Sequence, residues 1–455
     1  MKWKLLVIFL LTIFVRFYLL DVSTHFLSDE SRDLVNIHQI FVEKKITLVG
    51  PVSDDRSHVY SSLTYYMLLP FAAFFDFDPF GTVAGAAVWG IIVWAILVAI
   101  AYKLNKRNLL FIALAAAVWF PLVQTSRWPW NPNLMLFWLA MGIFMSSYKH
   151  PLLRISAGLC MGLSVHHHYL ALVPMVLMII KQKDMLYLAG AVSAFLPFVL
   201  FDLRHPPGIF ITRMIDYNKS QMGTNPIDLF IKLPQVIKYF LEYVFQEKIV
   251  FYIGGITAAA LALWDFVKRS YGRPWFLISI LTLFPLSMYS QQFHYLLPAI
   301  PFFAMWIIAP RTGLGAMLSK SMIILIFIGS VLSLPIHWSQ ADWEGNLKIL
   351  RGATQIIGQE VREKKMINAN MAVLSSPDIY PLGKRYRDVL LVNDIRLKTY
   401  EEFELSDNLF VVTKGSVADL RKDPAMELIY FRNGPVAGVW EIPESNWRVI
   451  QLNRY

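Results

Sequence analysis

Residues 59–75 read VYSSLTYYMLLPFAAFF, and the placement of this apolar block decides the topology of the whole chain. Pro70 lies inside the block, and Asp76 and Asp78 follow it. If the block crosses a membrane, every later segment changes sides. If it lies at the surface, the later segments keep the orientation that their basic loops indicate. The choice therefore depends on the rest of the sequence.

The composition defines the class of protein. The chain has 455 residues, of which 56% are hydrophobic and only 16% charged. The apolar residues come in blocks about the length of a bilayer crossing, which excludes both an ordinary soluble enzyme and a disordered chain. The single cysteine, Cys160, excludes a disulfide framework and a cysteine-based metal site. A polytopic α-helical membrane protein remains.

The apolar blocks predict roughly eleven transmembrane helices. The first, Leu5–Leu20, follows Lys2 and Lys4 and has no small-residue cleavage site after it, so we expect an uncleaved helix instead of a secretory signal. The other expected spans lie near 81–102, 108–125, 133–148, 155–166, 168–181, 184–202, 249–267, 274–290, 293–309 and 317–338.

The basic loops orient these spans. If residues 21–80 form one external loop, all the basic clusters fall on the side of the N-terminus, which is then cytoplasmic. If 59–75 crosses the membrane, the same clusters move outside, against the positive-inside rule. We therefore predict that 59–75 is an interfacial or re-entrant helix. The clusters are Lys103/Lys106/Arg107, Lys149/Arg154, Lys181/Lys183, Lys268/Arg269/Arg273 and Arg311.

Two domains are expected, a membrane part over 1–338 and a small extracytoplasmic α/β domain over 339–455. Equal numbers of acidic and basic residues in 339–455 leave the net charge of +10 among the apolar blocks, which indicates membrane topology and not nucleic-acid binding. Ser416 and Asp419 indicate a capped helix start. Strands are expected near 371–375, 388–393, 408–413, 425–431 and 438–442.

Acidic residues open the first external loop, in the segment Ser28–Asp33. Two adjacent carboxylates, Asp29 and Glu30, lie at a membrane surface beside Arg32. A low-dielectric surround favours proton uptake by a carboxylate, so this arrangement suits a general base. The alternative is an acidic loop that simply faces water.

Basic and aromatic residues mark the other external segments. Arg127, flanked by Trp128 and Trp130, suits either a phosphate or an interfacial anchor. Consecutive residues rarely aim three side chains at one ion, so we expect no metal at the run of three histidines that begins at His166. We expect contacts with an anionic headgroup or polar cavity there. Further donors near the external headgroups, which are also candidate anchors, are Arg204 and His294.

This arrangement resembles the C-fold (GT-C) glycosyltransferases that use polyprenyl-phosphate sugars, in particular the protein O-mannosyltransferase and aminoarabinose transferase group. The resemblance covers the membrane part in short pieces. They are Asp29–Asp33, the segment His58–Leu69 with Tyr65 and Tyr66, Ser126 and Arg127, Gly162–Ser164 with His168 and Tyr169, and Tyr295–Pro298 with Pro301.

The resemblance implies inverting transfer of a sugar to an extracytoplasmic protein, lipid or glycan acceptor, without a required cofactor and with a divalent cation left open. Asp29 matches the base and Glu30 is its companion. Arg127, with Arg204 or the group His166, His167, His168 and Tyr169, would hold the lipid phosphate. Accessory or acceptor contacts fall to Arg32, Asp54, Asp55, His58, Tyr65, Asn131 and His294.

Two departures from the family pattern matter. Some relatives have an acid where this chain has Asn131 or Asn133, so any second-carboxylate role passes to Glu30, Asp54 or Asp55, or is absent. The WWDYG signature of oligosaccharyltransferases is missing, which argues against transfer of a whole glycan to asparagine. There are two competing hypotheses. A transporter or lipid flippase would show charged residues near the bilayer midplane or repeated broken helices. The other hypothesis is a receptor or scaffold that presents residues 339–455.

The topology can be tested by cysteine labelling in a Cys160-free background. Cysteines at Ser53, Asn218 and Ser416 should react with an impermeant thiol reagent added to intact cells, because all three lie on the predicted external side. A cysteine at Asn105 should not react until the cells are opened. Labelling at Asn105 in intact cells would reverse the orientation.

Overall fold

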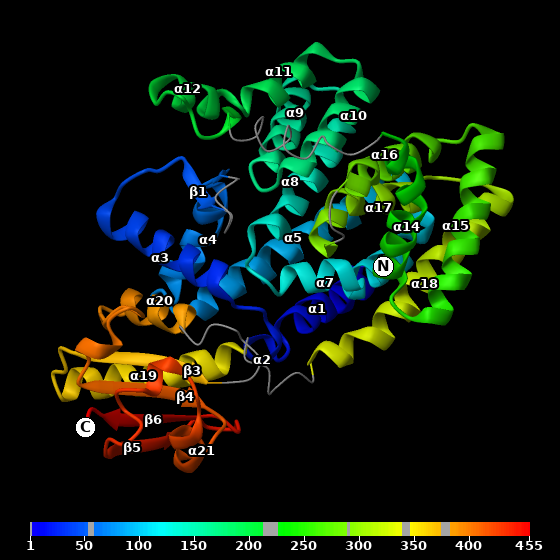
Figure 1. Cartoon of the computed structure of the whole chain (residues 1–455). Coiled ribbons are helices and arrows are strands. Elements are labelled where there is room, and N and C mark those ends of the chain that lie inside the picture. The colour runs from blue at the N-terminus through cyan, green and yellow to red at the C-terminus, as the bar shows by residue number, and fades with distance from the viewer. Residues whose placement is uncertain (1, 53–58, 213–225, 289–291, 339–345, 375–382) are drawn as a thin grey trace. The chain divides into compact units, whose positions relative to one another are not determined.

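The chain forms two compact units, seen in the computed structural model of Figure 1, which describes residues 2–52, 59–212, 226–288, 292–338, 346–374 and 383–455. The helical unit comprises Met1–Tyr18, Ile46–Met67 and Ala84–His337. The sheet unit comprises Leu19–Lys45, Leu68–Val83 and Trp338–Tyr455. The second unit therefore takes in two N-terminal segments besides the expected domain 339–455.

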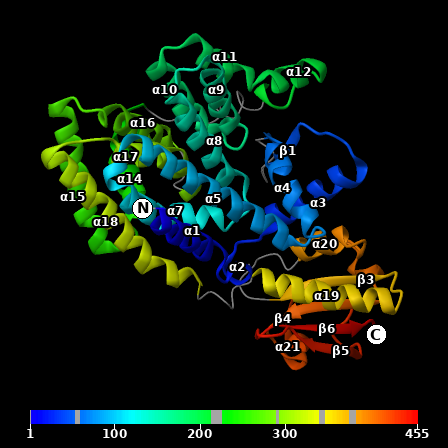
Figure 2. The same cartoon turned by 180° about the vertical axis from the view of Figure 1, so that it is seen from behind.

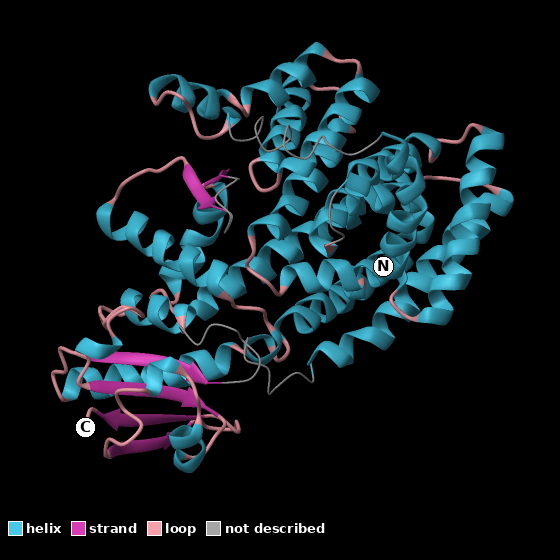
Figure 3. Cartoon of the chain, in the orientation of Figure 1, coloured by secondary structure: helices cyan, strands magenta, loops and turns pink. Residues whose placement is uncertain are grey.

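Helices dominate the first unit, as Figure 3 shows. A short antiparallel pair, β1 and β2, is its only sheet among the residues described. Its elements, with α4 and α5 continuing into the other unit, are α1 (Lys2–Phe17), β1 (Val49–Val52), β2 (Val59–Ser61), α4 (Leu63–Phe74), α5 (Pro79–Leu104), η1 (Lys106–Asn108), α6 (Leu109–Val118), α7 (Phe120–Ser126), α8 (Asn131–Ser146), α9 (Pro151–Val165), η2 (Tyr169–Ala171), α10 (Leu172–Gln182), α11 (Met185–Ser193), α12 (Leu196–Arg204), α14 (Pro226–Phe245), α15 (Lys248–Lys268), α16 (Arg273–Leu283), η3 (Phe284–Met288), η4 (Phe293–Ala299), α17 (Ile300–Ile308) and α18 (Gly313–Trp338).

Long apolar helices show that this is a polytopic helical membrane protein. Within the described residues, α5, α15 and α18 are long and apolar enough to cross a bilayer. Two bent pairs raise the number to five if each pair is one span: α6 with η1 against α7, bent by 49°, and α11 against α12, bent by 41°. The expectation of eleven spans stays a prediction.

Helix α4 covers most of the apolar block 59–75. It has 12 residues, which at the α-helical rise make about 18 Å, well short of a hydrocarbon core of about 30 Å. This helix is therefore too short to cross a membrane by itself, and the interfacial or re-entrant placement of 59–75 stays a prediction.

Glycines bring α9 directly against α11. A Cβ on Gly158 would lie 1.9 Å from the carbonyl oxygen of Tyr187, and one on Gly190 would lie 2.0 Å from that of Ile155. A Cβ on Gly162 would meet the Ala191 oxygen at 2.5 Å. Such close backbone approach is how small residues pack membrane helices.

The sheet unit is built on a four-stranded mixed sheet in the order β3-β4-β6-β5, where β3 and β4 are parallel and the other pairs antiparallel (Figure 3). Its buried core includes Leu409, Val411, Phe431 and Ile450. The elements are α2 (Leu20–Ser23), α3 (Ser28–Glu43), α19 (Leu347–Glu363), β3 (Ala369–Leu374), α20 (Lys384–Val392), η5 (Phe403–Leu405), β4 (Asn408–Thr413), α21 (Val417–Lys422), η6 (Met426–Leu428), β5 (Val436–Glu441) and β6 (Arg448–Asn453).

Three of the five expected strands are present, as β3, β4 and β5. The strand expected at 388–393 is wrong, because this run belongs to α20. Its buried apolar residues, Tyr386, Val389 and Leu390, follow a helical spacing that the short apolar run concealed. The strand expected at 425–431 is also wrong, since η6 and a turn lie there, and β6 was missed.

The capped helix start was predicted correctly. Ser416 is the N-cap of α21, and its hydroxyl accepts a hydrogen bond from the backbone N–H of Asp419 at 3.3 Å. In return, the backbone N–H of Ser416 donates to Asp419 Oδ2 at 2.7 Å. The Ser416 hydroxyl also donates to Asp419 Oδ2, at 2.7 Å, and this bond and the one from the Ser416 N–H hold the pKa of the Asp419 carboxyl below its usual value.

The glycine contact gives a stability test. Gly158→Ala should lower the thermal stability of detergent-solubilised protein by about 1–3 kcal/mol, because the new methyl has no space beside Tyr187. Gly255→Ala in α15 is the matched control, since its Cβ would meet only Leu241 Cδ1 at 3.9 Å. That change should be neutral or stabilising. A Gly158→Ala variant as stable as the parent would contradict the packing.

Candidate active site

The acidic segment singled out in the sequence forms the first turn of α3. Glu30 is 3% exposed, and its Oε2 accepts a hydrogen bond from the backbone N–H of Leu27 at 2.7 Å. Its carboxylate thus caps the helix start, where a negative charge also suits the helix dipole. The neighbouring Asp29 side chain is 38% exposed. Of the two carboxylates, Asp29 is the more exposed.

Arg32 joins two carboxylates on this helix. Its NH1 donates to Asp29 Oδ1 at 2.8 Å, and its Nε and NH2 donate to Asp33 Oδ1 at 3.1 and 2.9 Å. Asp33 is only 3% exposed. The guanidinium therefore holds Asp29 in one orientation against a buried acid.

Arg127, the candidate phosphate ligand, is bonded to the end of α1. It is 6% exposed. Its NH1 donates to the carbonyl oxygens of Val15 and Arg16 at 2.8 and 3.1 Å, and its NH2 donates to that of Tyr18 at 2.8 Å. These are carbonyls that a helix leaves unpaired at its C-terminus. The contacts are those of a helix cap, and a phosphate role for Arg127 stays a prediction.

Arg16 is a buried charge that the sequence argument missed. Its side chain is 0% exposed, and its NH1 donates to the carbonyl oxygens of Thr12 and Ala117 at 3.3 and 2.9 Å. Ala117 lies near the end of α6, where the chain bends into α7. The signal was present in the sequence, since a charged residue inside an apolar run requires a polar partner.

The loop after Arg127 is held by two asparagine amides. Asn131 Nδ2 donates to the carbonyl oxygen of His167 at 2.8 Å, and Asn133 Nδ2 donates to that of Trp128 at 2.9 Å. Trp128 and Trp130 stack with ring centroids 4.7 Å apart. Both asparagines therefore hold backbone at the positions where some relatives carry an acid.

Two of the three consecutive histidines hold the structure together. His167 is fully buried, and its Nε2 accepts from the indole N–H of Trp138 at 3.0 Å. This places its proton on Nδ1, which donates to Thr64 Oγ1 at 2.9 Å. His166 Nε2 donates to the carbonyl oxygen of Ala194 at 2.8 Å. The protein thus engages both ring nitrogens of His167 and one of His166.

The third histidine belongs to an aromatic group that we call the rim cluster, drawn from four separate segments. His168 lies 5.4 Å from His294 and 5.8 Å from Tyr60, between ring centroids. Trp130 meets His294 edge-on at 4.5 Å. Aromatic faces and imidazole nitrogens together suit a sugar or a phosphate headgroup. The rim cluster comprises Tyr60, Trp130, His168, Tyr169, His294 and Tyr295.

The remaining expected site residues fall in different places. Tyr169 donates its hydroxyl proton to the carbonyl oxygen of Val59, and Tyr65 is buried in α4. Arg204 is exposed at the end of α12. Asp54, Asp55 and His58 lie outside the described residues. The helical unit therefore brings together Asn131, the histidines and Tyr169, whereas Asp29, Glu30 and Arg32 belong to the sheet unit.

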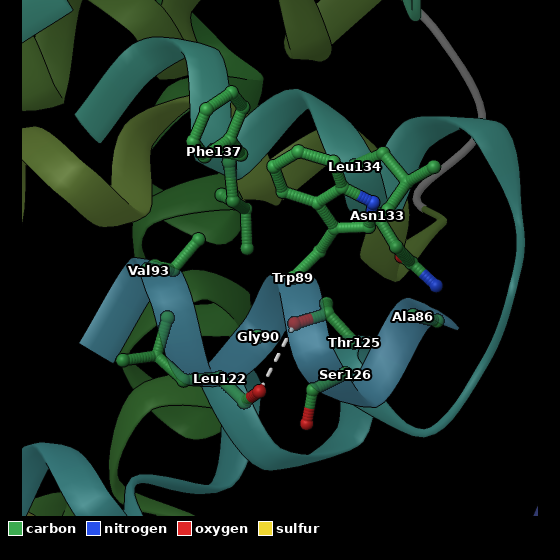
Figure 4. Close-up of a pocket in the computed structure, with 11 residues that line it drawn as sticks. Ala86, Trp89, Gly90, Val93, Leu122, Thr125, Ser126, Asn133, Leu134 and Phe137 are labelled. Carbon is green, nitrogen blue, oxygen red and sulfur yellow. Dashed lines mark hydrogen bonds between the residues drawn. The ribbon is translucent and has the colours of Figure 1, made fainter. Parts of the chain in front are cut away.

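A small pocket lies between α5, α7 and α8 (Figure 4). Thr125 Oγ1 bonds back to the carbonyl oxygens of Pro121 and Leu122 in its own helix, the latter drawn as a dashed line. A Cβ on Gly90 would lie 2.1 Å from that of Ser126. The pocket's hydroxyls thus serve the helix packing that positions the loop.

The fold is of the C-fold glycosyltransferase type, and it is like that of an aminoarabinose transferase. The solved structure in question is ArnT from Cupriavidus metallidurans bound to undecaprenyl phosphate, with a TM-score of 0.59. The match covers 98% of this chain and 97% of that chain at 10% sequence identity, so the likeness is one of fold. No protein-family model matches the chain, and no curated protein matches its sequence.

The contacts of Arg127 give a prediction. Arg127→Met should lower the thermal stability of the solubilised protein, because three carbonyls at the end of α1 lose their donor, at about 1–3 kcal/mol for each buried group left unpaired. Arg127→Lys should lie between Met and the parent, since an ammonium lacks the planar fork. Arg204→Met, at an exposed position, is the control and should leave stability unchanged. Unaltered stability of Arg127→Met would show that these bonds do not hold α1.

Proposed function

We propose that this protein is an integral membrane glycosyltransferase that moves a sugar from a polyprenyl-phosphate donor to an acceptor outside the cytoplasm. The observation that carries the proposal is the ArnT-like fold over nearly the whole chain, since that neighbour is bound to undecaprenyl phosphate. The accessible Asp29 carboxylate supports a transferase, because it is held in place and not consumed by helix capping.

The proposed chemistry is one displacement at the anomeric carbon. Asp29 takes the proton of an acceptor hydroxyl while the acceptor oxygen forms a bond to that carbon. The bond between the carbon and the phosphate oxygen breaks, and the lipid phosphate leaves with the electron pair. A single displacement inverts the configuration. General base catalysis of this kind contributes on the order of 10²–10⁴-fold.

Negative charge develops on the departing phosphate, and hydrogen-bond donors or cationic groups are needed to stabilise it. His168 and His294 in the rim cluster, Arg204 and Arg127 are the groups proposed to supply them. Fixed donors aimed at developing charge typically contribute about 3–4 kcal/mol each. Because His166 and His167 bond to the protein through their rings, we assign the phosphate role within that run to His168.

The proposed setting is the cytoplasmic membrane, with the N-terminus inside and Asp29 on the outer face. The acceptor is a protein, lipid or glycan, and no cofactor is required. A transporter is less well supported. The buried ion pair between Asp265 and Arg311, 2.7 Å apart, lies in the last turn of α15 and just before α18, away from the helix centres where a transport site is expected.

The function is tested first on the products. Mass spectrometry of glycans and glycolipids from cells with and without the gene should show a sugar that appears only when the gene is present, together with its acceptor. Purified protein with a polyprenyl-phosphate sugar should then transfer that sugar in vitro. An unchanged set of glycans and glycolipids would contradict the proposal.

The base is tested by Asp29→Asn, which keeps the shape and removes the basicity. Transfer should fall by about 100-fold or more, with the protein folded and inserted. Glu30→Gln retains an oxygen that can accept from Leu27, so it should keep most activity. Asp394→Asn is the matched control. This residue is exposed in the same unit, and its φ of 60° is one that asparagine tolerates. Near-normal turnover of Asp29→Asn would remove it from the mechanism.

A further inference from the structure

Helix α3, which carries Asp29, is hydrogen-bonded to α20. Ser31, two residues after Asp29 and 0% exposed, donates its hydroxyl proton to Asp388 Oδ2 at 2.6 Å. The two residues are 357 positions apart in the sequence. Helices α3 and α20 lie side by side in both views of the fold (Figures 1 and 2). A hydrogen bond to a carboxylate is among the stronger contacts available to a hydroxyl.

Asp388 is itself held in place. Lys384 Nζ lies 2.8 Å from Asp388 Oδ2, one helical turn away, and the Asp388 side chain is 17% exposed. The same oxygen thus accepts from α3 and from a lysine of its own helix. This arrangement leaves the carboxylate little freedom to rotate, so the position of Ser31 follows that of α20.

Helix α20 is in turn fixed to the sheet by Arg387. Its NH2 donates to Asn370 Oδ1 and to the Met371 carbonyl oxygen, both at 2.6 Å, and its NH1 donates to the Lys398 carbonyl oxygen at 2.5 Å. Burial lowers the pKa of Arg387 to about 10, so the guanidinium stays charged at neutral pH. A continuous set of polar contacts therefore runs from β3 through α20 to the first turn of α3.

We propose that Asp388 is a positioning residue for Asp29, and that the sheet unit takes part in the transfer reaction by fixing the base. The proposal rests on the proposed function, in which Asp29 is the base. A general base works only within hydrogen-bond reach of the proton that it removes, and a displacement of about 1 Å can cost on the order of 10²-fold in rate. Ser31 and Asp388 hold the turn that sets this distance.

The decisive variants are Asp388→Ala and Ser31→Ala. Each should lower kcat by about tenfold or more while the KM for the lipid donor changes little, because the base moves and the donor groups do not. Asp388→Asn retains an oxygen that can accept from Ser31, so it should recover most of the rate that Asp388→Ala loses. Asp394→Asn, on the exposed turn after the same helix, keeps a side chain that tolerates the φ of 60° at this position, so it is the matched control and should be silent.

A double-variant cycle separates positioning from general destabilisation. If both residues act through one hydrogen bond, Ser31→Ala with Asp388→Ala should be no slower than either single variant. Losses that multiply, or a normal kcat for both single variants, would overturn the positioning role. Ser31→Ala removes one oxygen from a buried site, so it gives an answer even if Asp388→Ala fails to fold.

The experiment also distinguishes this proposal from the function on which it rests. If Asp29→Asn is inactive while the Ser31 and Asp388 variants are normal, the positioning role is wrong and the base stands. If Asp29→Asn is active, the base is wrong. If the parent protein transfers no sugar from any polyprenyl-phosphate donor, the function itself is wrong.

Discussion

The bond between Arg127 and the last carbonyls of α1 is the contact on which the arrangement of the helical unit depends. A helix leaves its last carbonyl groups without a partner inside the helix. Arg127 reaches three of them from the end of α7, and Arg16 reaches Ala117 near the end of α6. Two guanidinium groups thus fix three helix ends, and with them the start of the loop that leads into α8.

The same loop determines what the rim of the helical unit can do. Once Arg127 is fixed, Trp130 lies edge-on to His294 and Asn131 holds the backbone at His167. Asn131 and Asn133 bond to backbone carbonyl groups and stand where some relatives carry an acid, so this loop adds no carboxylate to the proposed site. In the proposed chemistry, the role of base therefore stays with Asp29.

Sequence patterns predicted the features that depend on neighbouring residues. The capped helix start at Ser416 was predicted, because the hydrogen bonding that decides it is local. The helix at 388–393 and the strand β6 were not, since short apolar runs fit either structure. The residues alone did not rank Asp29 above Glu30. The family resemblance did, and the position of the helix start shows that Glu30 is the carboxylate used for capping.

Contacts between distant segments were beyond the sequence argument, and the most consequential one involves α3. This helix has 16 residues with a polar composition, and isolated helices of such length are marginal in water. Its rigidity must come from tertiary packing, which α20 supplies through Ser31 and Asp388. A base needs a rigid support to hold its geometry. Under the proposed function, the sheet unit is the scaffold of the helix that carries Asp29, and N-terminal segments fold as part of that unit.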